Sequence, residues 1–516
     1  MSVFLAALAA RRAPDRDRRW LYLPYDQLTD RVGPLARAAP DEVGIVLVET
    51  AWKAGRRPYH QQKLALVLAN QRQFALEQAA RGVAVDYRFD RRPYAAVLDE
   101  VVAERGPLVA MVPAERELRA DLGPLVERGG IELVPHEGWL TTDADFAALG
   151  GSPWRMDAFY RGVRRRTGIL MDSGKPVGGK FSLDADNREA WRGEPPAPAP
   201  LTFRPDAVTS EVCDLVRARF ADHPGRVEPE RLPATAADAE ALWDWARRRC
   251  LPQFGTYEDA MSTASGGLFH TRISPLLNNL RLLARRVVDD VAQDDTVPLN
   301  SREGFVRQVL GWREYVRHVH AATDGFADRA DRLGRADPLP RAYWEGAPSG
   351  LRCLDTLVAQ VWDEGWTHHI PRLMVLSNLA CLLDVAPTAL SDWFWEAYVD
   401  AYDWVVEPNV LGMSTFSVGD QMTTKPYVAG AAYIDRMGDF CRGCAFDPKE
   451  TCPITPMYWA FLARHRAALD PVDRLRMPLR SVDQRDPAKR AADAQVFERV
   501  RDVLRAGGRL RPGFER

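Results

Sequence analysis

Short apolar runs alternate with helical stretches over about the first 140 residues of the chain. Five runs are too continuously apolar to have one wet face: WLYLPYDQL, VGIVLVET, VAVDYRF, PLVAMV and IELVP. Between the second and third runs, apolar spacing predicts an amphipathic helix that ends at Gly82. Its apolar positions include Leu64, Leu66, Leu68 and Phe74. Buried strands that alternate with helices predict a doubly wound parallel sheet, an α/β domain over residues 1–150.

Polar residues follow the first two predicted strands. Ligands of parallel α/β sheets bind beyond the carboxyl ends of the strands. This rule points to Asp26 and Gln27 after the first strand, and to Glu49 and Thr50 after the second. No GxGxxG motif and no Walker-type loop occurs here. The domain is therefore not predicted to be an ordinary dinucleotide or triphosphate domain.

Residues 151–210 differ in composition from the segments on either side. They are rich in glycine, proline and charge, and they predict a helix followed by a long loop with the stiff sequence EPPAPAP. We interpret them as an interdomain linker. Five of its arginines fall within twelve residues: Arg155, Arg161, Arg164, Arg165 and Arg166. Such a run is either a solvated helix face or a patch that binds anions.

The strand pattern disappears after the linker. Stretches such as SREGFVRQVLGWREYVRHVH and PTALSDWFWEAYVDAYDWVV have helical spacing, and tryptophan is frequent. We find no internal repeat. Residues 211–516 are therefore predicted to form an all-α domain.

Length and composition add limits to this picture. A chain of 516 residues is too long for one hydrophobic core. With 46% hydrophobic and 27% charged residues, it has the composition of a soluble protein, and no apolar run approaches the roughly 20 residues that span a bilayer. Seven cysteines without a repeating framework favour a reducing cytoplasm, and the N-terminal charge order does not favour a secretory signal. A net charge of −2 does not indicate a nucleic-acid-binding protein, although an average conceals local patches.

Three of the seven cysteines are clustered in the sequence FCRGCAFDPKETCP, at Cys441, Cys444 and Cys452. The C-x2-C spacing is typical of zinc and of iron–sulfur ligands, and neither centre is complete with three thiols. The spacing alone leaves an iron–sulfur cluster, a zinc ion and unliganded buried thiols open. A fourth ligand would be one of Cys213, Cys250, Cys353 and Cys381.

An ordered set of motifs in the helical half resembles the photolyase/cryptochrome family. The motifs are FHTRISPLLNN, QVLGWREYVRH, THHIPRLMVLSNLA, DWFWEAYVDAYDWVVEPNVLGMS and KPY, followed by the cysteine run. In particular the set is similar to the branch of bacterial iron–sulfur (6-4) photolyases and cryptochromes. The resemblance covers nearly the whole chain. It implies an α/β antenna domain and an all-helical FAD-binding domain that carries a [4Fe–4S] cluster, with Cys353 as the upstream ligand beside Cys441, Cys444 and Cys452.

The resemblance also implies a set of flavin-binding residues: Tyr257, His270, Thr271, Arg272, Ile273, Ser274, Arg313, Asp403 and Asn409. A helix that begins at Ser274 would present free N–H groups and a favourable dipole to the cofactor's phosphates. The same residues also fit an ordinary helix start, with Ser274 as the cap and Pro275 in the first position. The two interpretations are compatible.

Light-driven repair of a (6-4) photoproduct needs an electron and a proton. The resemblance favours His369, with His368 beside it, as the acid–base group, a role that suits the titration range of histidine. A pair of histidines before a proline can also simply cap a helix. Gln308 and Tyr427 are predicted to hydrogen-bond the damaged bases. Trp393 matches the family's flavin-proximal electron carrier, although most aromatics at helical spacing belong to the core.

The remaining expectations concern partners. We expect UV-damaged DNA as the substrate, contacted by Arg164, Arg165, Arg166 and Lys180 in the linker, and a 6,7-dimethyl-8-ribityllumazine antenna at the strand-end residues. We also expect a cytoplasmic bacterial monomer with no membrane partner. The leading hypothesis is a (6-4) photolyase. The alternatives are a cryptochrome photoreceptor with the same cofactors, and a light-independent iron–sulfur protein that binds nucleic acid.

Overall fold

A five-stranded parallel sheet forms the centre of the N-terminal domain. The computed structural model describes residues 2–14 and 17–514. The strands are β1 (Arg19–Tyr22), β2 (Val43–Thr50), β3 (Ala84–Asp90), β4 (Leu108–Met111) and β5 (Ile131–Val134). Their spatial order is β3-β2-β1-β4-β5, and all neighbours are parallel. Each predicted apolar run coincides with one strand, so the predicted parallel sheet is confirmed.

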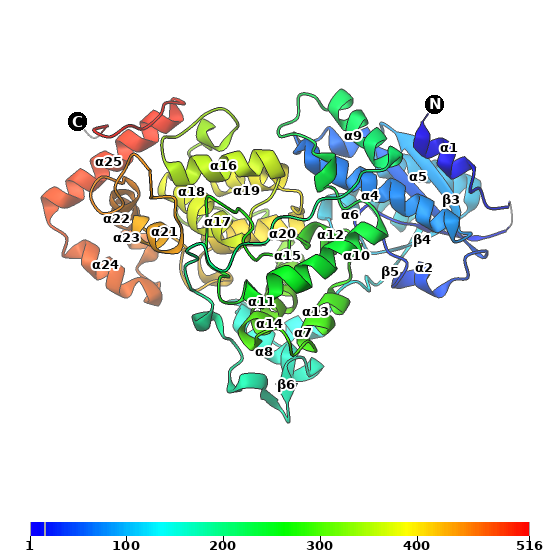
Figure 1. Cartoon of the computed structure of the whole chain (residues 1–516), viewed down its shortest axis with the longest axis horizontal. Coiled ribbons are helices and arrows are strands. Elements are labelled where there is room, and N and C mark those ends of the chain that lie inside the picture. The colour runs from blue at the N-terminus through cyan, green and yellow to red at the C-terminus, as the bar shows by residue number, and fades with distance from the viewer. Residues whose placement is uncertain (1, 15–16, 515–516) are drawn as a thin grey trace.

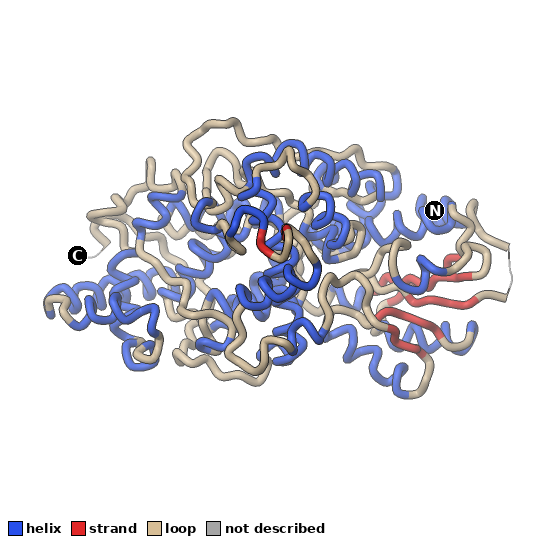
Figure 2. The backbone as a smooth tube through the Cα atoms, turned by 90° about the horizontal axis from the view of Figure 1, so that it is seen from below, coloured by secondary structure: helices blue, strands red, loops and turns tan. Residues whose placement is uncertain are grey.

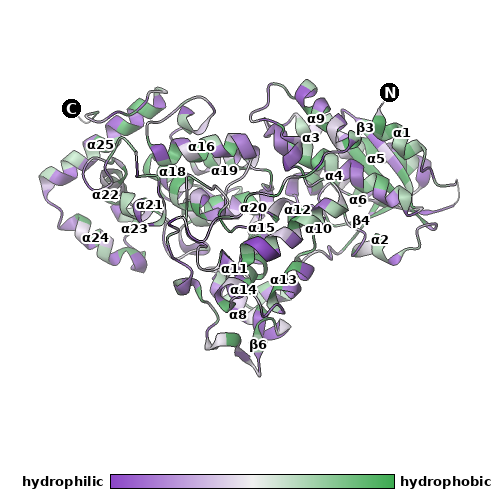
Figure 3. Ribbon diagram, viewed as in Figure 1, coloured by the Kyte–Doolittle hydropathy of each residue, from purple (hydrophilic) through white to green (hydrophobic). Residues whose placement is uncertain are grey.

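Both faces of this sheet are covered by helices. On one face, Leu21, Ile45 and Leu47 pack in a core that also contains Phe4 of α1 (Val3–Ala9) and Phe74 of α4 (Gln61–Ala80). The alternate strand residues face the opposite layer, made by α5 (Tyr94–Arg105) and α6 (Arg116–Glu127). Burial on both faces explains why the strands are continuously apolar. Figure 3 shows the sheet mostly in the hydrophobic colour.

A helix at each end of the predicted linker packs on a neighbouring domain. Helix α8 (Met156–Thr167) lies against the helical body, and α9 (Ala207–Arg219) packs on α4 of the α/β domain. Gln73 of α4 donates to Asp206 at the start of α9 at 2.8 Å. Between these helices the chain forms the short β6–β7 hairpin (Met171–Asp172 and Lys175–Pro176) and then runs mainly without regular structure. The extended part of the linker is therefore residues 168–206.

The rest of the chain is helical, as predicted. The short N-terminal helices not yet named are α2 (Gly33–Arg37), α3 (Ala51–Ala54) and α7 (Asp143–Ala147). The helical body contains α10 (Ala236–Trp245), α11 (Leu251–Phe254), α12 (Ser274–Asn278), α13 (Ala284–Ala292), α14 (Leu299–Val306), α15 (Glu314–Thr323), α16 (Arg352–Glu364), α17 (His369–Pro371), α18 (Asn378–Leu382), α19 (Pro387–Ala397) and α20 (Asp403–Glu407). The C-terminal lobe contains α21 (Ala431–Met437), α22 (Ile454–Arg464), α23 (Arg466–Leu469), α24 (Arg476–Asp483) and α25 (Pro487–Arg505).

The two ends of the chain lie at opposite ends of the molecule. Figure 1 shows the sheet at the N-terminal end, the C-terminal lobe at the other end and the helical body between them. Seen from below in Figure 2, the strands are confined to the N-terminal end, apart from the small hairpin. No helix within the described residues is both long and apolar enough to cross a membrane.

Candidate active site

A large cavity opens in the helical body. Its volume is about 1240 Å³, which exceeds the roughly 300–1,000 Å³ of typical small-molecule pockets. All five residues of the predicted flavin-phosphate segment, 270–274, line it. The segment stands immediately before and at the start of α12, where helix N–H groups have no intrahelical partner. A cavity of this size beside a helix start suits a ligand that carries phosphate.

A carboxylate joins this segment to the helix that follows the histidine pair. The side chain of Asp400 accepts a hydrogen bond of 2.6 Å from Ser274 Oγ. It also pairs with Arg372, whose two terminal nitrogens lie at 2.9 and 3.0 Å. All three residues line the cavity. A bidentate pair of this kind holds a cation and an anion at fixed positions in the cavity wall.

Asp403, a predicted flavin contact, lies outside the cavity wall. Asp403 is fully buried and does not line the cavity; its carboxylate accepts from the backbone N–H of Arg116, at the start of α6, at 2.6 Å. The cavity-facing acid is Asp400, three residues earlier. Arg313, also a predicted flavin contact, lines the cavity, and its guanidinium lies 4.6 Å from the ring centre of Trp139. Burial lowers the pKa of Arg313 to about 10.

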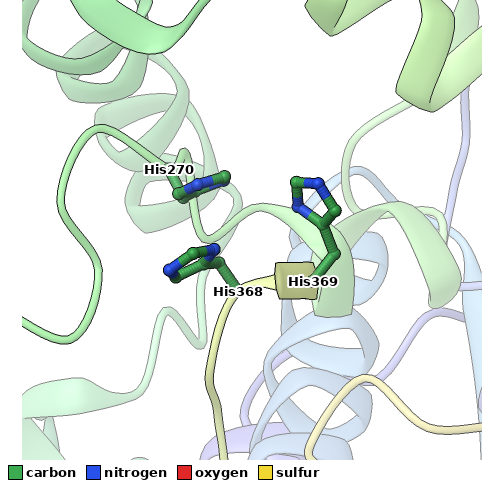
Figure 4. Close-up of side chains that lie close together, drawn as sticks. All are labelled: His270, His368 and His369. Carbon is green, nitrogen blue, oxygen red and sulfur yellow. The ribbon is translucent and has the colours of Figure 1, made fainter. Parts of the chain in front are cut away.

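Three histidines meet at one side of the cavity (Figure 4). The rings of His270 and His368 stack with centroids 4.1 Å apart and planes at 14°. His369 stands edge-on to both, at 5.4 and 6.0 Å. Burial lowers the pKa of each ring below its usual value. The predicted pair is thus a trio, and sequence separation concealed its third member.

The trio is not well arranged for a metal ion, even though one nitrogen of each ring lies within 4.8 Å of the others. The lone pairs of imidazole nitrogens lie in the ring plane, so two parallel stacked rings do not aim them at one point. Burial is the largest cause of the lowered pKa of His270 and His368, and the positive charges of Arg272 and Arg372 lower it further. His270 Nε2 also lies 3.2 Å from the carbonyl oxygen of Glu258. We therefore do not interpret the trio as a metal site.

Glu258 organises the part of the wall next to the histidines. Its carboxylate accepts from Gln308 Nε2 at 2.6 Å, from Asn187 Nδ2 at 2.8 Å and from Arg307 at 3.1 Å. The side chain of Glu258 is buried, yet three donors satisfy it. Gln308, predicted to hydrogen-bond the damaged bases, lines the cavity, and Glu258 sets the orientation of its amide.

Irregular helical turns carry much of the cavity wall. Arg307–Arg313, Arg372–Ser377 and Pro408–Ser414 are π-helical, and each contributes side chains to the cavity. Such turns interrupt the regular α-helical spacing and are frequent at functional sites. Asn409, a predicted flavin contact in the third turn, lines the cavity and donates to the carbonyl of Val405 at 2.7 Å.

Two further predicted contacts have different outcomes. Tyr427 lines the cavity, and burial raises its pKa. Tyr257 is not among the lining residues, so the structure does not support its flavin contact. Its hydroxyl donates to the carbonyl of Glu194 at 3.2 Å, and its ring stacks on Phe269 in a small separate core.

Cationic side chains surround the cavity mouth. Four lining residues take part in no ion pair within the described chain: Lys180, Lys425, Arg436 and Arg474. Three of the four are exposed, and Lys425 is half-buried. They come from the linker and from the C-terminal part of the chain. Of these four, Lys180 alone was predicted from the sequence, because it lies in the linker and the other three do not.

The linker arginines are corrected in part. Arg164 is fully buried, and its nitrogens donate to the carbonyls of Ile169, Leu170 and Phe181. It holds the linker in place and cannot reach a phosphate. Arg165 and Arg166 are exposed. Arg166 pairs with Asp145 of α7 and does not line the cavity.

Trp393 lies behind the cavity wall. It is buried and does not line the cavity, whereas Phe394 and Tyr398 do. The ring of Trp393 is 6.0 Å from Tyr398 and 6.1 Å from Trp362. Trp362 in turn stacks on Trp344, with centroids 5.5 Å apart and planes at 16°. Because Trp344 is half-buried, the aromatic series reaches from the cavity wall toward the surface.

Four thiols converge in the C-terminal lobe. Cys353, from α16, joins Cys441, Cys444 and Cys452 around a small hollow whose other walls are apolar, including Phe440 and Phe446. The neighbouring thiols raise the pKa of Cys353 after burial. Cys213, Cys250 and Cys381 do not line this hollow. The fourth member of the predicted set is therefore in place, although 88 residues separate it from Cys441.

The predicted strand-end site divides into two halves. β1 and β4 are neighbours at the point where the strand order reverses, the usual place for a ligand. There Asp26 Oδ1 and Gln27 Oε1 are buried without a hydrogen-bond partner in the chain. Burial raises the pKa of Asp26 to about 6. Glu49, in contrast, pairs with Arg72 at 2.7 Å and accepts from Tyr87.

Thr50, the fourth predicted strand-end residue, also has local partners. Its hydroxyl donates to the carbonyl of Arg92 at 2.6 Å and caps α3 by accepting from Trp52 N. Glu49 and Thr50 thus satisfy structural needs of the domain. Of the four predicted residues, Asp26 and Gln27 are the two with a buried side-chain oxygen that has no hydrogen-bond partner in the described chain.

Comparisons with known proteins agree with this geometry. A family model described as deoxyribodipyrimidine photo-lyase-related protein matches residues 21–232, and one described as FAD binding domain of DNA photolyase matches residues 305–443. A (6-4) photolyase of Agrobacterium fabrum is 33% identical over 503 residues, which cover 93% of this chain and 96% of the relative. The chain belongs to the photolyase-related family. The family's FAD-binding region includes most of the cavity wall described above.

Solved structures of photolyases and cryptochromes share the fold. A bacterial class III photolyase from Agrobacterium tumefaciens superposes with a TM-score of 0.58 at 14% identity, covering 95% of this chain and 99% of that chain. A cryptochrome from Synechocystis superposes with a TM-score of 0.52 at 14% identity, covering 78% and 83%. At such low identity these likenesses establish the two-domain photolyase architecture alone.

Proposed function

We propose that this protein is a light-dependent (6-4) photolyase that repairs pyrimidine photoproducts in DNA. One observation carries the proposal: the flavin-phosphate segment and the three histidines line a single cavity. An electron donor and a proton donor would therefore reach the same bound base. The relative named (6-4) photolyase, which matches nearly the whole chain, supports the same reaction.

The cavity fits FAD on the chemistry of its wall. Thr271 and Ser274 offer hydroxyls beside the N-terminus of α12, where an anion is favoured. The Arg372–Asp400 pair would hold balanced charge near the rest of the cofactor. FAD, when bound, supplies a light-driven electron. The protein's own contribution is to position the cofactor and the lesion and to exclude water.

His369 is proposed to exchange the proton with the lesion. Its ring lies at the cavity wall, with its pKa lowered mainly by burial and raised in part by Glu258. A neutral imidazole at neutral pH can accept a proton and return it within one reaction cycle. Gln308 and Tyr427 would hydrogen-bond the base, since both line the same cavity.

The lesion has to leave the stacked duplex to enter this cavity. Lys180, Lys425, Arg436 and Arg474 at the mouth would hold the neighbouring phosphates, because they have no ion-pair partners within the described chain. DNA binding is thus proposed to be local, although the net charge of the chain is −2.

The four-thiol site fits an iron–sulfur cluster better than zinc. Tetrahedral zinc with sulfur at about 2.3 Å holds its thiolates about 3.8 Å apart. In the described chain, the histidine trio is the one set of three or more His, Cys, Asp or Glu ligand atoms within 4.8 Å of one another, so the thiols are more widely spaced. We propose a [4Fe–4S] cluster held by Cys353, Cys441, Cys444 and Cys452.

The strand-end site fits an antenna chromophore in part. We propose that 6,7-dimethyl-8-ribityllumazine binds near Asp26 and Gln27, because a polar heterocycle would satisfy their two free buried oxygens. We also propose a cytoplasmic monomer. Neither statement bears on the repair reaction.

Repair of defined lesions tests the proposed function. Protein with reduced flavin is mixed with a duplex that carries one (6-4) photoproduct, illuminated with blue light, and the DNA is digested and analysed by mass spectrometry. Restored pyrimidines in the light and none in the dark are expected. Light-dependent flavin reduction without repair of any lesion would instead favour a cryptochrome.

A further inference from the structure

A buried lysine of the α/β domain reaches into the wall of the flavin cavity. Lys63 lies in the first turn of α4 and is only 7% exposed. Its Nζ donates to two carbonyl oxygens of the helical body, those of Trp395 and Ala401, each at 2.7 Å. No ion pair in the described chain includes it. The amine therefore contacts backbone carbonyls and two aromatic rings, those of Tyr59 and Tyr402, whose centroids lie 4.7 and 5.9 Å from Nζ.

The two acceptors are positions where the chain needs a donor. Trp395 lies in the last turn of α19, where carbonyls have no intrahelical partner and a cation is favoured. The backbone N–H of His60 donates to the next carbonyl, that of Glu396, at 2.8 Å. The start of α4 thus supplies the C-terminal cap of α19 across the domain interface.

The second acceptor, Ala401, is itself part of the cavity wall. Ala401 follows Asp400, whose side chain accepts from Ser274 at 2.6 Å and from Arg372 at 2.9 Å. The backbone carbonyl of Asp400 also accepts from Asn278 Nδ2 at 2.9 Å. Lys63 therefore fixes the peptide next to the carboxylate that joins the phosphate segment to Arg372.

We propose that Lys63 is a positioning residue for the flavin site. Through it, the α/β domain sets the position of Asp400 and hence of Ser274 and Arg372. The proposal rests on FAD binding and does not depend on repair of any lesion. It predicts that the affinity for flavin depends on a side chain outside the helical domain.

Replacement of Lys63 by Met tests the proposal. Methionine has a similar length and removes the amine and its donors, which leaves two buried carbonyls without a partner. Flavin should dissociate at least about tenfold faster. Release is measured by the rise in FAD fluorescence after dilution of the holoprotein, and circular dichroism reports whether the fold is retained.

Lys53→Met is the matched control. Lys53 lies at the same interface, 5.6 Å from the ring centre of Trp395, but its Nζ pairs with the carboxylates of Glu115 and Glu117. Its loss should leave flavin dissociation close to the parent rate. If flavin dissociates equally faster from both variants, the proposal is overturned, because the loss of any lysine at this interface would then have the same effect.

A double-mutant cycle separates positioning from general destabilisation. If Lys63 acts through Asp400, adding Lys63→Met to Asp400→Asn should change flavin release little. If the effects of the two substitutions on flavin release are additive, the proposal is contradicted. Lys63→Gln keeps N–H donors on a shorter side chain and should give an intermediate rate. If the Met variant fails to fold, the same cycle is run with Gln, and independence there has the same meaning.

Discussion

The imidazole of His270 stacks on that of His368, with ring centroids 4.1 Å apart. This contact joins the flavin-phosphate segment to the histidine pair, which are separated by almost a hundred residues of chain. Two stacked rings in a buried site cannot readily both be charged. The stack therefore favours neutral rings at His270 and His368, and His369 is the ring that we propose as the proton carrier.

Replacement of His369 by Ala should strongly slow repair and leave the flavin in place. His369 lies outside the 270–274 segment, so the cofactor keeps its phosphate contacts. The repair rate should fall by about two orders of magnitude, a scale typical of a lost acid–base group. Mass spectrometry of repaired DNA and the flavin spectrum are the two measurements. His223→Ala, away from the cavity, is the control, and repair at the parent rate by the His369 variant would refute the assignment.

Replacement of Cys353 by Ser should remove the cluster. Loss of one of four thiolates leaves an incomplete ligand set. Iron and sulfide analysis of anaerobically purified protein should show strong loss in this variant. Cys213→Ser should retain both, because Cys213 is buried in α9, outside the four-thiol hollow. Stoichiometric zinc without iron in the parent protein would contradict the cluster.

Replacement of Trp362 by Phe should slow photoreduction of the flavin. Trp362 stands between Trp393 and the half-buried Trp344, with ring distances of 6.1 and 5.5 Å. Phenylalanine retains the packing but is not readily oxidised. Transient absorption of the flavin measures the rate. Trp243→Phe, whose indole bonds Asp290 instead, should leave the rate unchanged, and an unchanged rate in both variants would exclude this route.

Replacement of Arg474 by Ala should weaken DNA binding and its salt dependence. Each phosphate contact contributes a slope of about −0.9 in log K against log salt concentration. The slope measured with lesion-containing duplex should therefore become less steep by about that amount. Arg166→Ala is the control, because Arg166 is exposed but paired with Asp145. A salt-independent affinity of the parent protein would contradict the proposed contacts.

Replacement of Asp26 by Asn should stabilise the ligand-free protein at high pH. Burial raises the folded-state pKa of Asp26 to about 6, so the folded form holds a proton that the unfolded form releases. Its stability contribution is full below the unfolded pKa and is lost as the pH rises through 6. The variant should gain on the order of 2–3 kcal/mol at pH 8 and little at pH 4. Urea unfolding at the two pH values measures this, and an equal gain at both would contradict it.

Local patterns in the sequence were sufficient for the architecture. Each strand is buried on both faces, so its apolar run is continuous, and α4 ends before Gly82, whose φ of +91° suits glycine. The cysteine spacing and residues 270–274 were also readable, because ligands on one tight turn or one helix start are neighbours in sequence. Among the distant cysteines, it was the family resemblance that selected Cys353, and the structure then placed it in the thiol hollow.

Only the tertiary structure decided which polar groups face the cavity. Asp400 and Asp403 are only three residues apart. Asp400 pairs with Arg372 in the cavity wall, whereas Asp403 accepts from the first backbone N–H of α6 in the α/β domain. Arg164 belongs to a run of arginines, but its burial commits it to backbone carbonyls. Lys63 has no motif of its own. The direction of a side chain depends on packing between distant segments, and the spacing of apolar residues along the chain does not reveal that packing.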